Sequence, residues 1–126
     1  MNSGKDLKDR TKQFALRVIR LYRALPRNEE ARVIGKQLLR SGTSIGANYR
    51  AACRGRSKAE FVAELGIVLE EADETVFWLE LLQESDIMNV QSLAPLVQEA
   101  RELTAIFVAS VCTAKESQKT EVRMQK

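Results

Sequence analysis

The chain has 126 residues, of which 44% are hydrophobic and 29% are charged, and its formal net charge is +3. This length suits a single domain, and the composition is that of a globular protein rather than a disordered or membrane-embedded one. The sequence contains no histidine, which excludes most catalytic triads and most zinc sites.

No segment has the pattern of a membrane span or an export signal. The longest nearly apolar stretch, 103–114, is shorter than the roughly 20 residues that cross a bilayer. The charged N-terminus lacks the apolar core of a signal peptide, so we expect a cytoplasmic protein with no membrane partner. In a reducing compartment, Cys53 and Cys112 are interpreted as small core residues rather than as a disulfide or a metal site.

The first predicted helix covers residues 5–25. Its apolar side chains recur every three, four or seven residues and form one stripe, made of Leu7, Phe14, Val18, Leu21 and Leu25. Pro26 ends the helix, because proline donates no backbone hydrogen bond and disfavours helix in the residue before it.

The second predicted helix covers residues 29–54, with Asn28 as its N-cap. Its apolar stripe is Ile34, Leu38, Ser41, Ile45, Tyr49 and Ala52. Gly42 and Gly46 weaken a helix interior, but the apolar phase is unbroken on either side of them. We therefore expect a helix whose small residues let another backbone approach closely. A loop that divides this helix near residues 41–47 is the alternative.

The third helix is predicted over residues 58–84, after a capping box formed by Ser57 and Glu60. The fourth is predicted over 92–117, with Ser92 as its cap and Pro95 in its first turn. Apolar stripes follow both helices, namely Phe61, Leu65, Val68, Ala72, Thr75, Leu79 and Leu82, then Leu96, Ala100, Leu103, Phe107, Ser110 and Ala114. We expect the polar tail 118–126 to fray.

Four long helices joined by short turns pack best as antiparallel neighbours. The predicted fold is therefore an all-α, up-down antiparallel four-helix bundle, with the whole chain, 1–126, as one domain. No strand-type alternation competes with this interpretation.

Charge is distributed unevenly along the chain. Residues 1–63 contain 15 Lys and Arg against 5 Asp and Glu, whereas residues 64–126 contain 5 against 12. A basic surface on the first two helices could neutralise phosphates and bind nucleic acid with little sequence preference. The alternative is that these side chains pair with acidic helices of the same or a neighbouring subunit. The candidate nucleic-acid-binding residues are Arg20, Arg23, Arg27, Arg32, Lys36, Arg40, Arg50, Arg54 and Arg56.

Acidic residues gather on the last two helices, at Glu70, Glu71, Asp73, Glu74, Glu99 and Glu102. Carboxylate-rich helical bundles can hold two iron ions, but those sites also use Glu-x-x-His motifs. Here histidine is absent and the acids fall between the apolar stripe positions, which indicates a solvated face. We expect no metal, no cofactor, no catalytic residue and no enzymatic activity.

Apolar residues also occur outside the core stripe of the third helix. Ile67, Trp78 and Leu81 share a mainly acidic face, and a tryptophan in that setting is typical of a buried interface. A basic face and an acidic face on one molecule suit a head-to-tail ring. The alternative is that a wide bundle core absorbs these residues.

The motifs SGTSIGANYR at 41–50, SKAEF at 57–61 and EADET at 71–75, followed by Trp78-Leu79, resemble a known family. This is the bacterial four-helix-bundle family encoded by intervening sequences within 23S ribosomal RNA genes. The resemblance implies a homopentamer. It also implies kinship with the accessory variability protein of diversity-generating retroelements, a pentamer that binds nucleic acid and a reverse transcriptase.

Two functional hypotheses follow. The first is a non-enzymatic homo-oligomeric adaptor, pentameric as the resemblance implies, which binds RNA or DNA through the first two helices and could engage a protein partner such as a reverse transcriptase. The alternative is a protein-binding scaffold whose basic face is used in subunit contacts.

Overall fold

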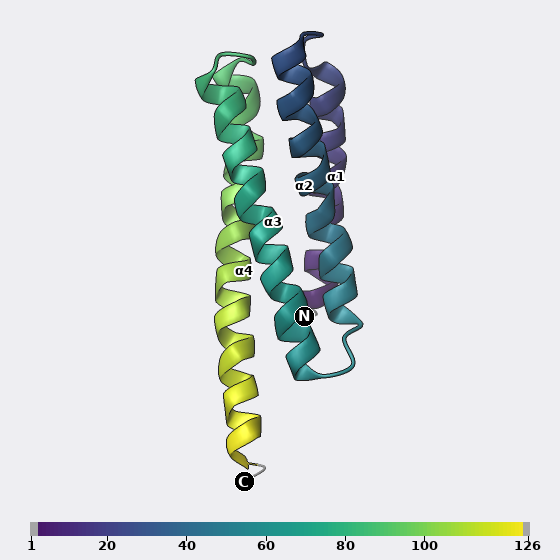
Figure 1. Cartoon of the computed structure of the whole chain (residues 1–126), viewed down its shortest axis with the longest axis vertical. Coiled ribbons are helices and arrows are strands. Elements are labelled where there is room, and N and C mark those ends of the chain that lie inside the picture. Colours follow the sequence, from purple (N-terminus) through teal and green to yellow (C-terminus); the bar gives the residue numbers. More distant parts are fainter. Residues whose placement is uncertain (1–2, 125–126) are drawn as a thin grey trace.

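The computed structural model describes residues 3–124, with side chains from residue 6 onward. It contains four helices, α1 (Ser3–Ala24), α2 (Glu29–Cys53), α3 (Lys58–Glu84) and α4 (Val90–Met124), and no strand within the described residues. Each helix packs lengthwise against the next one along the chain, whereas α1 and α4 meet over a shorter stretch. Figure 1 shows the resulting up-and-down arrangement, which confirms the predicted four-helix bundle.

The helix starts follow local capping chemistry. Asn28 accepts a hydrogen bond from the backbone N–H of Ala31 at 2.8 Å, and Ser57 accepts one from the N–H of Glu60 at 3.1 Å. These bonds satisfy N–H groups that have no partner within the first turn of a helix. The Glu60 side chain also turns back and accepts a bond from the backbone N–H of Arg56.

The second helix is continuous through residues 41–47, as predicted. A Cβ atom added at Gly42 would lie 2.9 Å from Cγ2 of Val18, and one at Gly46 would lie 3.2 Å from Oγ1 of Thr11. The two glycines therefore let α1 approach the backbone of α2 more closely than a larger residue would permit. On another face of the same segment, the buried Thr75 hydroxyl of α3 donates to Ser41 at 2.9 Å.

The fourth helix differs most from the prediction. It begins two residues earlier, because Asn89 rather than Ser92 acts as the cap and accepts a bond from the N–H of Gln91 at 2.7 Å. Pro95 consequently lies inside the helix, beyond its first turn. The predicted frayed tail is helical as far as Met124, and Figure 1 shows these last turns projecting past the other helices. Residues 125–126 of that tail lie outside the described residues.

The core contains most of the predicted stripes, including Phe14, Leu38, Leu65 and Phe107. Val111 rather than Ser110 is buried on α4, and Leu93 and Thr11 are core residues that the stripes did not include.

The interpretation of the two cysteines as core residues is wrong, because both are exposed. Cys53 is the last residue of α2, where the end of the bundle leaves it uncovered. Cys112 lies on the outer side of α4, next in sequence to the buried Val111.

Candidate nucleic-acid interface

The basic residues of α2 lie opposite its buried face. A helix turns by about 100° per residue, so Arg32, Lys36 and Arg50 return to similar angles, roughly half a turn from the buried Ile45, and Arg54 follows as the C-cap residue of the helix. All four are exposed. The local sequence thus builds a basic ridge along the outer side of α2.

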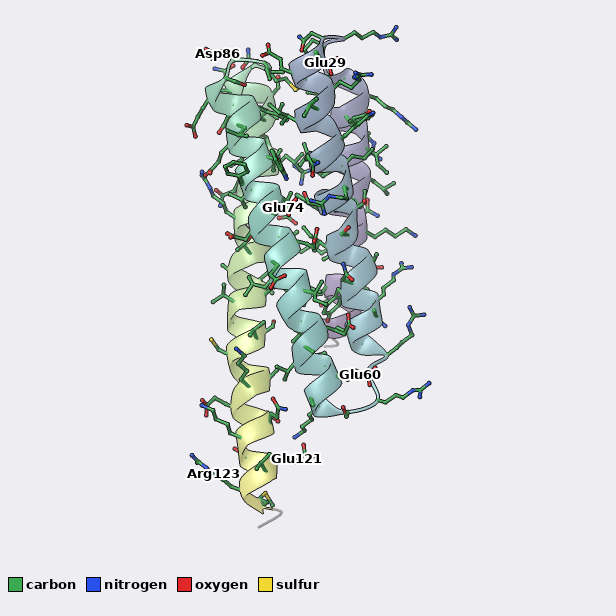
Figure 2. All side chains as sticks on the ribbon, viewed as in Figure 1. Glu29, Glu60, Glu74, Asp86, Glu121 and Arg123 are labelled. Atoms are coloured by element: carbon green, nitrogen blue, oxygen red, sulfur yellow. The ribbon has the colours of Figure 1, made fainter. Side chains whose placement is uncertain are left out.

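Further basic residues extend this ridge onto α1 and the connecting segments. Arg20 and Arg23 are exposed on the last turns of α1, Arg27 lies in the α1–α2 turn, and Arg56 lies between α2 and α3. Figure 2 shows long nitrogen-tipped side chains that project into solvent from this side of the molecule. We call the nine predicted residues the basic surface, made of Arg20, Arg23, Arg27, Arg32, Lys36, Arg40, Arg50, Arg54 and Arg56.

Most of the basic surface has no neutralising partner in the part of the chain that the structure describes. Among the described residues, seven of its nine members have no carboxylate within ion-pair distance, the exceptions being Arg32 and Arg40. Arg32 contacts Glu29 of its own helix at 2.8 Å, with both side chains largely in solvent. Such an exposed pair contributes little to stability and can exchange partners.

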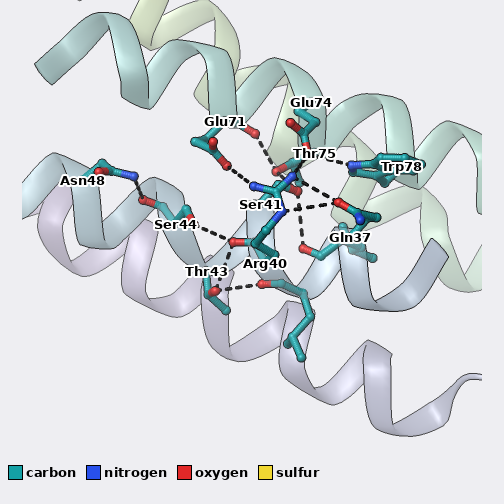
Figure 3. A network of polar contacts seen from close by, with 12 residues as sticks. Gln37, Arg40, Ser41, Thr43, Ser44, Asn48, Glu71, Glu74, Thr75 and Trp78 are labelled. Carbon is teal, nitrogen blue, oxygen red and sulfur yellow. Dashed lines mark hydrogen bonds and ion pairs between the residues drawn. The ribbon is translucent and has the colours of Figure 1, made fainter. Parts of the chain in front are cut away.

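Arg40 has a different environment from the other basic residues. Its guanidinium donates to Glu71 at 3.2 Å and also to Glu74, both on α3. Glu74 in turn accepts a hydrogen bond from the indole N–H of Trp78 at 2.9 Å. Figure 3 shows these contacts joined to the Ser41–Thr75 hydrogen bond. Arg40 is therefore paired within the subunit. We call the contacts among Arg40, Ser41, Glu71, Glu74, Thr75 and Trp78 the α2–α3 polar network.

The acidic residues of α3 and α4 are largely engaged in ion pairs. Arg10 of α1 forms a bidentate contact with Glu99 at 2.7 Å and a further bond with Glu102 at 3.0 Å. The hydrogen bond from Arg10 lowers the pKa of the Glu99 carboxyl, and the charge of Arg17 acts in the same direction. Arg101 likewise pairs with Glu80 at 3.0 Å.

The candidate acidic cluster does not form a metal site. Within the described residues, no group of three or more Asp, Glu, Cys or His side chains could hold a metal ion. Glu71 and Glu74 face Arg40, whereas Glu99 and Glu102 face Arg10, so four of the six acids neutralise arginines.

The three predicted interface residues lie on α3, where Ile67 is 41% exposed and Trp78 and Leu81 are half-buried. The structure adds Phe77, which is 50% exposed and packs edge-on against Trp78, with 5.0 Å between the ring centroids. Phe77 lies two residues from each of the core residues Thr75 and Leu79, which places it on the opposite side of the helix. This spacing could have predicted from sequence that Phe77 points outward. We call these four residues the apolar face of α3.

A comparison with family models matches residues 5–109 to the 23S rRNA-intervening sequence proteins. The chain belongs to this family. A crystal structure of a protein of unknown function from the S23 ribosomal protein family of Bacteroides thetaiotaomicron is similar in fold, with a TM-score of 0.80 and 35% sequence identity. The similarity covers 87% of this chain and 98% of that one. No curated protein matches the sequence.

The family match contains the polar network, the apolar face of α3 and the whole basic surface. It ends at residue 109, within α4, so the projecting turns of that helix lie beyond it. The descriptions of the family and of the similar structure name no enzymatic activity. Among the described residues, no helix combines the length and apolar character that crossing a membrane requires.

Proposed function

We propose that this protein is a non-enzymatic, oligomeric adaptor that binds RNA or DNA through its basic surface. The observation that carries the proposal is the set of seven exposed basic side chains that lack an ion-pair partner among the described residues. They extend from the end of α1 over α2 to the α2–α3 connection. Phosphate groups of a nucleic-acid backbone are natural partners for such a ridge.

Two further features support this proposal. The family description refers to an intervening sequence of 23S rRNA and that of the similar structure to a ribosomal protein family, so both names connect the family with ribosomal RNA or the ribosome. Acids of α3 and α4 such as Glu71 and Glu99 are paired with Arg40 and Arg10, so these carboxylates compete little with phosphate for the basic surface.

Oligomerisation is part of the proposal, with the apolar face of α3 as the subunit interface. Ile67 and Phe77 would lose their exposure to water there, which favours association. The pentamer implied by the family resemblance would present five copies of the basic surface. Several weak contacts with one nucleic acid then combine into a much stronger one.

The test is a titration of labelled RNA and DNA by fluorescence anisotropy at several salt concentrations, with particle mass from light scattering. We expect binding that weakens steeply with salt. The triple variant Arg50→Gln, Arg54→Gln, Arg56→Gln should reduce the slope of log affinity against log salt by about one for each phosphate contact removed. Arg40 is left intact because it holds Glu71 and Glu74.

The matched control is the triple variant Glu64→Gln, Glu70→Gln, Asp73→Gln on α3, whose carboxylates form no ion pair among the described residues. Its affinity should stay the same or rise. No binding by the natural sequence at low salt, with the oligomer intact, would refute the proposal.

The exposed Ile67 and Phe77 also favour a second candidate, a protein-binding scaffold. In that case the basic surface is consumed in contacts between subunits, and high salt should dissociate the oligomer. Light scattering at low and high salt separates the two candidates, because an apolar interface survives salt.

A further inference from the structure

An open hollow with a volume of about 800 Å³ lies where the chain turns from α1 into α2. Its walls include the last turn of α1, the Pro26 turn and the first residues of α2. This volume is within the range of small-molecule and cofactor sites. The hollow combines one aromatic ring with three arginines, namely Tyr22 with Arg23, Arg27 and Arg32.

The ring of Tyr22 is held in place by the backbone of α2. A Cβ atom added at Gly35 would lie 3.2 and 3.3 Å from Cδ1 and Cε1 of that ring, and 2.6 Å from Cδ1 of Leu25. Gly35 thus lets the ring lie close against α2 while part of it stays exposed to the hollow. The first half of the chain has three other aromatic residues, Phe14, Tyr49 and Phe61. Phe14 and Tyr49 are buried, and the partly buried Phe61 lies near the start of α3, at the opposite end of the bundle from the hollow. Tyr22 is therefore the aromatic ring that a ligand in this hollow can reach.

The charge of the hollow favours an anion. Three arginines and Glu29 give the lining a formal charge of +2. The Glu29 carboxylate accepts two bonds from Arg32, at 2.8 and 3.0 Å, so its charge is already compensated. Arg23 and Arg27 are exposed and have no ion-pair partner among the described residues. Both are available for a phosphate.

Resting on the proposed nucleic-acid binding, we infer that this hollow receives one unpaired nucleotide of a single-stranded RNA or DNA. The base stacks on Tyr22, and the adjoining phosphate pairs with Arg23 and Arg27. Stacking requires a base that has left its duplex, because a paired base shows only its edges. An acidic peptide would use the arginines but would leave the ring without a partner of matching shape.

The experiment compares a short single strand carrying 2-aminopurine with a duplex of the same length. Tyr22→Leu keeps an apolar side chain next to Gly35 but removes the ring. It should weaken single-strand binding about tenfold, the effect of one lost stacking contact, and leave duplex binding unchanged. The natural protein should quench 2-aminopurine fluorescence, and Tyr22→Leu should not. Tyr22→Phe retains the ring and should behave like the natural protein.

Each other outcome is decisive. If Tyr22→Leu binds single strands as tightly as the natural protein does, the inference fails while the proposed function stands. If no nucleic acid binds at low salt, the proposed function itself fails. If polyglutamate displaces the single strand equally well from the natural protein and from Tyr22→Leu, the hollow is an acidic-peptide site and the inference is overturned. The exposed pair Arg23→Gln, Arg27→Gln, which leaves the core untouched, should weaken binding of the same strand and provides an independent test.

Discussion

The two halves of the bundle use their charges in opposite ways. On α1, α2 and the segments that follow them, seven residues of the basic surface extend into solvent without an ion-pair partner among the described residues. On α3 and α4, acids such as Glu71, Glu80 and Glu99 face arginines. Two of those arginines, Arg10 and Arg40, come from the basic half and connect it to the acidic half.

Charge counted along a sequence is therefore not the charge that a surface presents. The second half has 12 acidic and 5 basic residues, yet much of its negative charge is compensated by contacts across the bundle. The first half keeps an uncompensated excess of positive charge. A polyanion approaching the molecule therefore encounters a stronger contrast than the formal net charge of +3 suggests.

The halves differ in packing as well. Gly42 of α2 lies against Val18 of α1, whereas a Cβ atom added at Gly66 of α3 would meet no atom within 4 Å. The same residue type therefore has opposite roles. At Gly42 it permits a close contact between helices, and at Gly66 it only lowers the helix propensity of an open position.

The largest effect is expected from the same substitution at these two glycines. Gly42→Leu should lower the free energy of unfolding by about 2 kcal/mol, because overpacking against Val18 outweighs the gain in helix propensity. Gly66→Leu should raise it by roughly 0.5–1 kcal/mol. Urea denaturation measures both changes. Equal effects at the two sites would show that the α1–α2 contact is not close, and light scattering checks that neither variant changes assembly.

The stripes predicted most of the bundle because apolar spacing and capping residues act locally. Asn28, Ser57 and Pro26 set helix ends through contacts within a few residues. The start of α4 was missed because Asn89 and Ser92 are equally good caps by residue type, so residue type alone does not show which of them accepts the capping bond. The helical tail was missed because its polar composition resembles that of a fraying end.

A smaller effect is expected from the Arg10–Glu99 pair that joins the halves. In the folded protein the pKa of the Glu99 carboxyl lies below its ordinary value of 4.5, because Arg10 donates hydrogen bonds to it. Ionised Glu99 therefore stabilises the protein above about pH 4.5. This stabilisation, about 1 kcal/mol for a partly exposed pair, is lost as the pH falls through the folded-state pKa. Glu99→Gln should therefore unfold more easily at neutral pH and lose less stability on acidification.

Urea midpoints at about pH 7 and about pH 3.5 test this difference. Glu116→Gln is the matched control, because Glu116 has only a distant, highly exposed contact with Lys119 at 3.8 Å. Its pH dependence should equal that of the natural protein. A Glu99→Gln variant with the same pH dependence as the natural sequence would contradict the pairing.

The nine basic candidates could be predicted from sequence as a set, but their individual environments could not. Helical spacing placed Arg40 near Arg50 and Arg54, and all three are exposed. Spacing along one helix does not reveal which acids another helix brings within reach. The sequence therefore did not predict that Arg40 pairs with Glu71 and Glu74. Likewise, the hollow beside Tyr22 depends on how α1 and α2 meet at Gly35, which no local pattern specifies.

The smallest effect on stability should separate Arg40 from Arg54. Arg40→Gln removes a half-exposed ion pair and should cost about 0.5 kcal/mol, while Arg54→Gln should cost nothing measurable. The order should reverse for nucleic-acid affinity. Arg54 offers an uncompensated charge to phosphate, whereas the charge of Arg40 is already balanced by Glu71 and Glu74. Thermal unfolding and anisotropy titration of the two variants test both orders, and an equal loss of affinity would mean that phosphate displaces the carboxylates from Arg40.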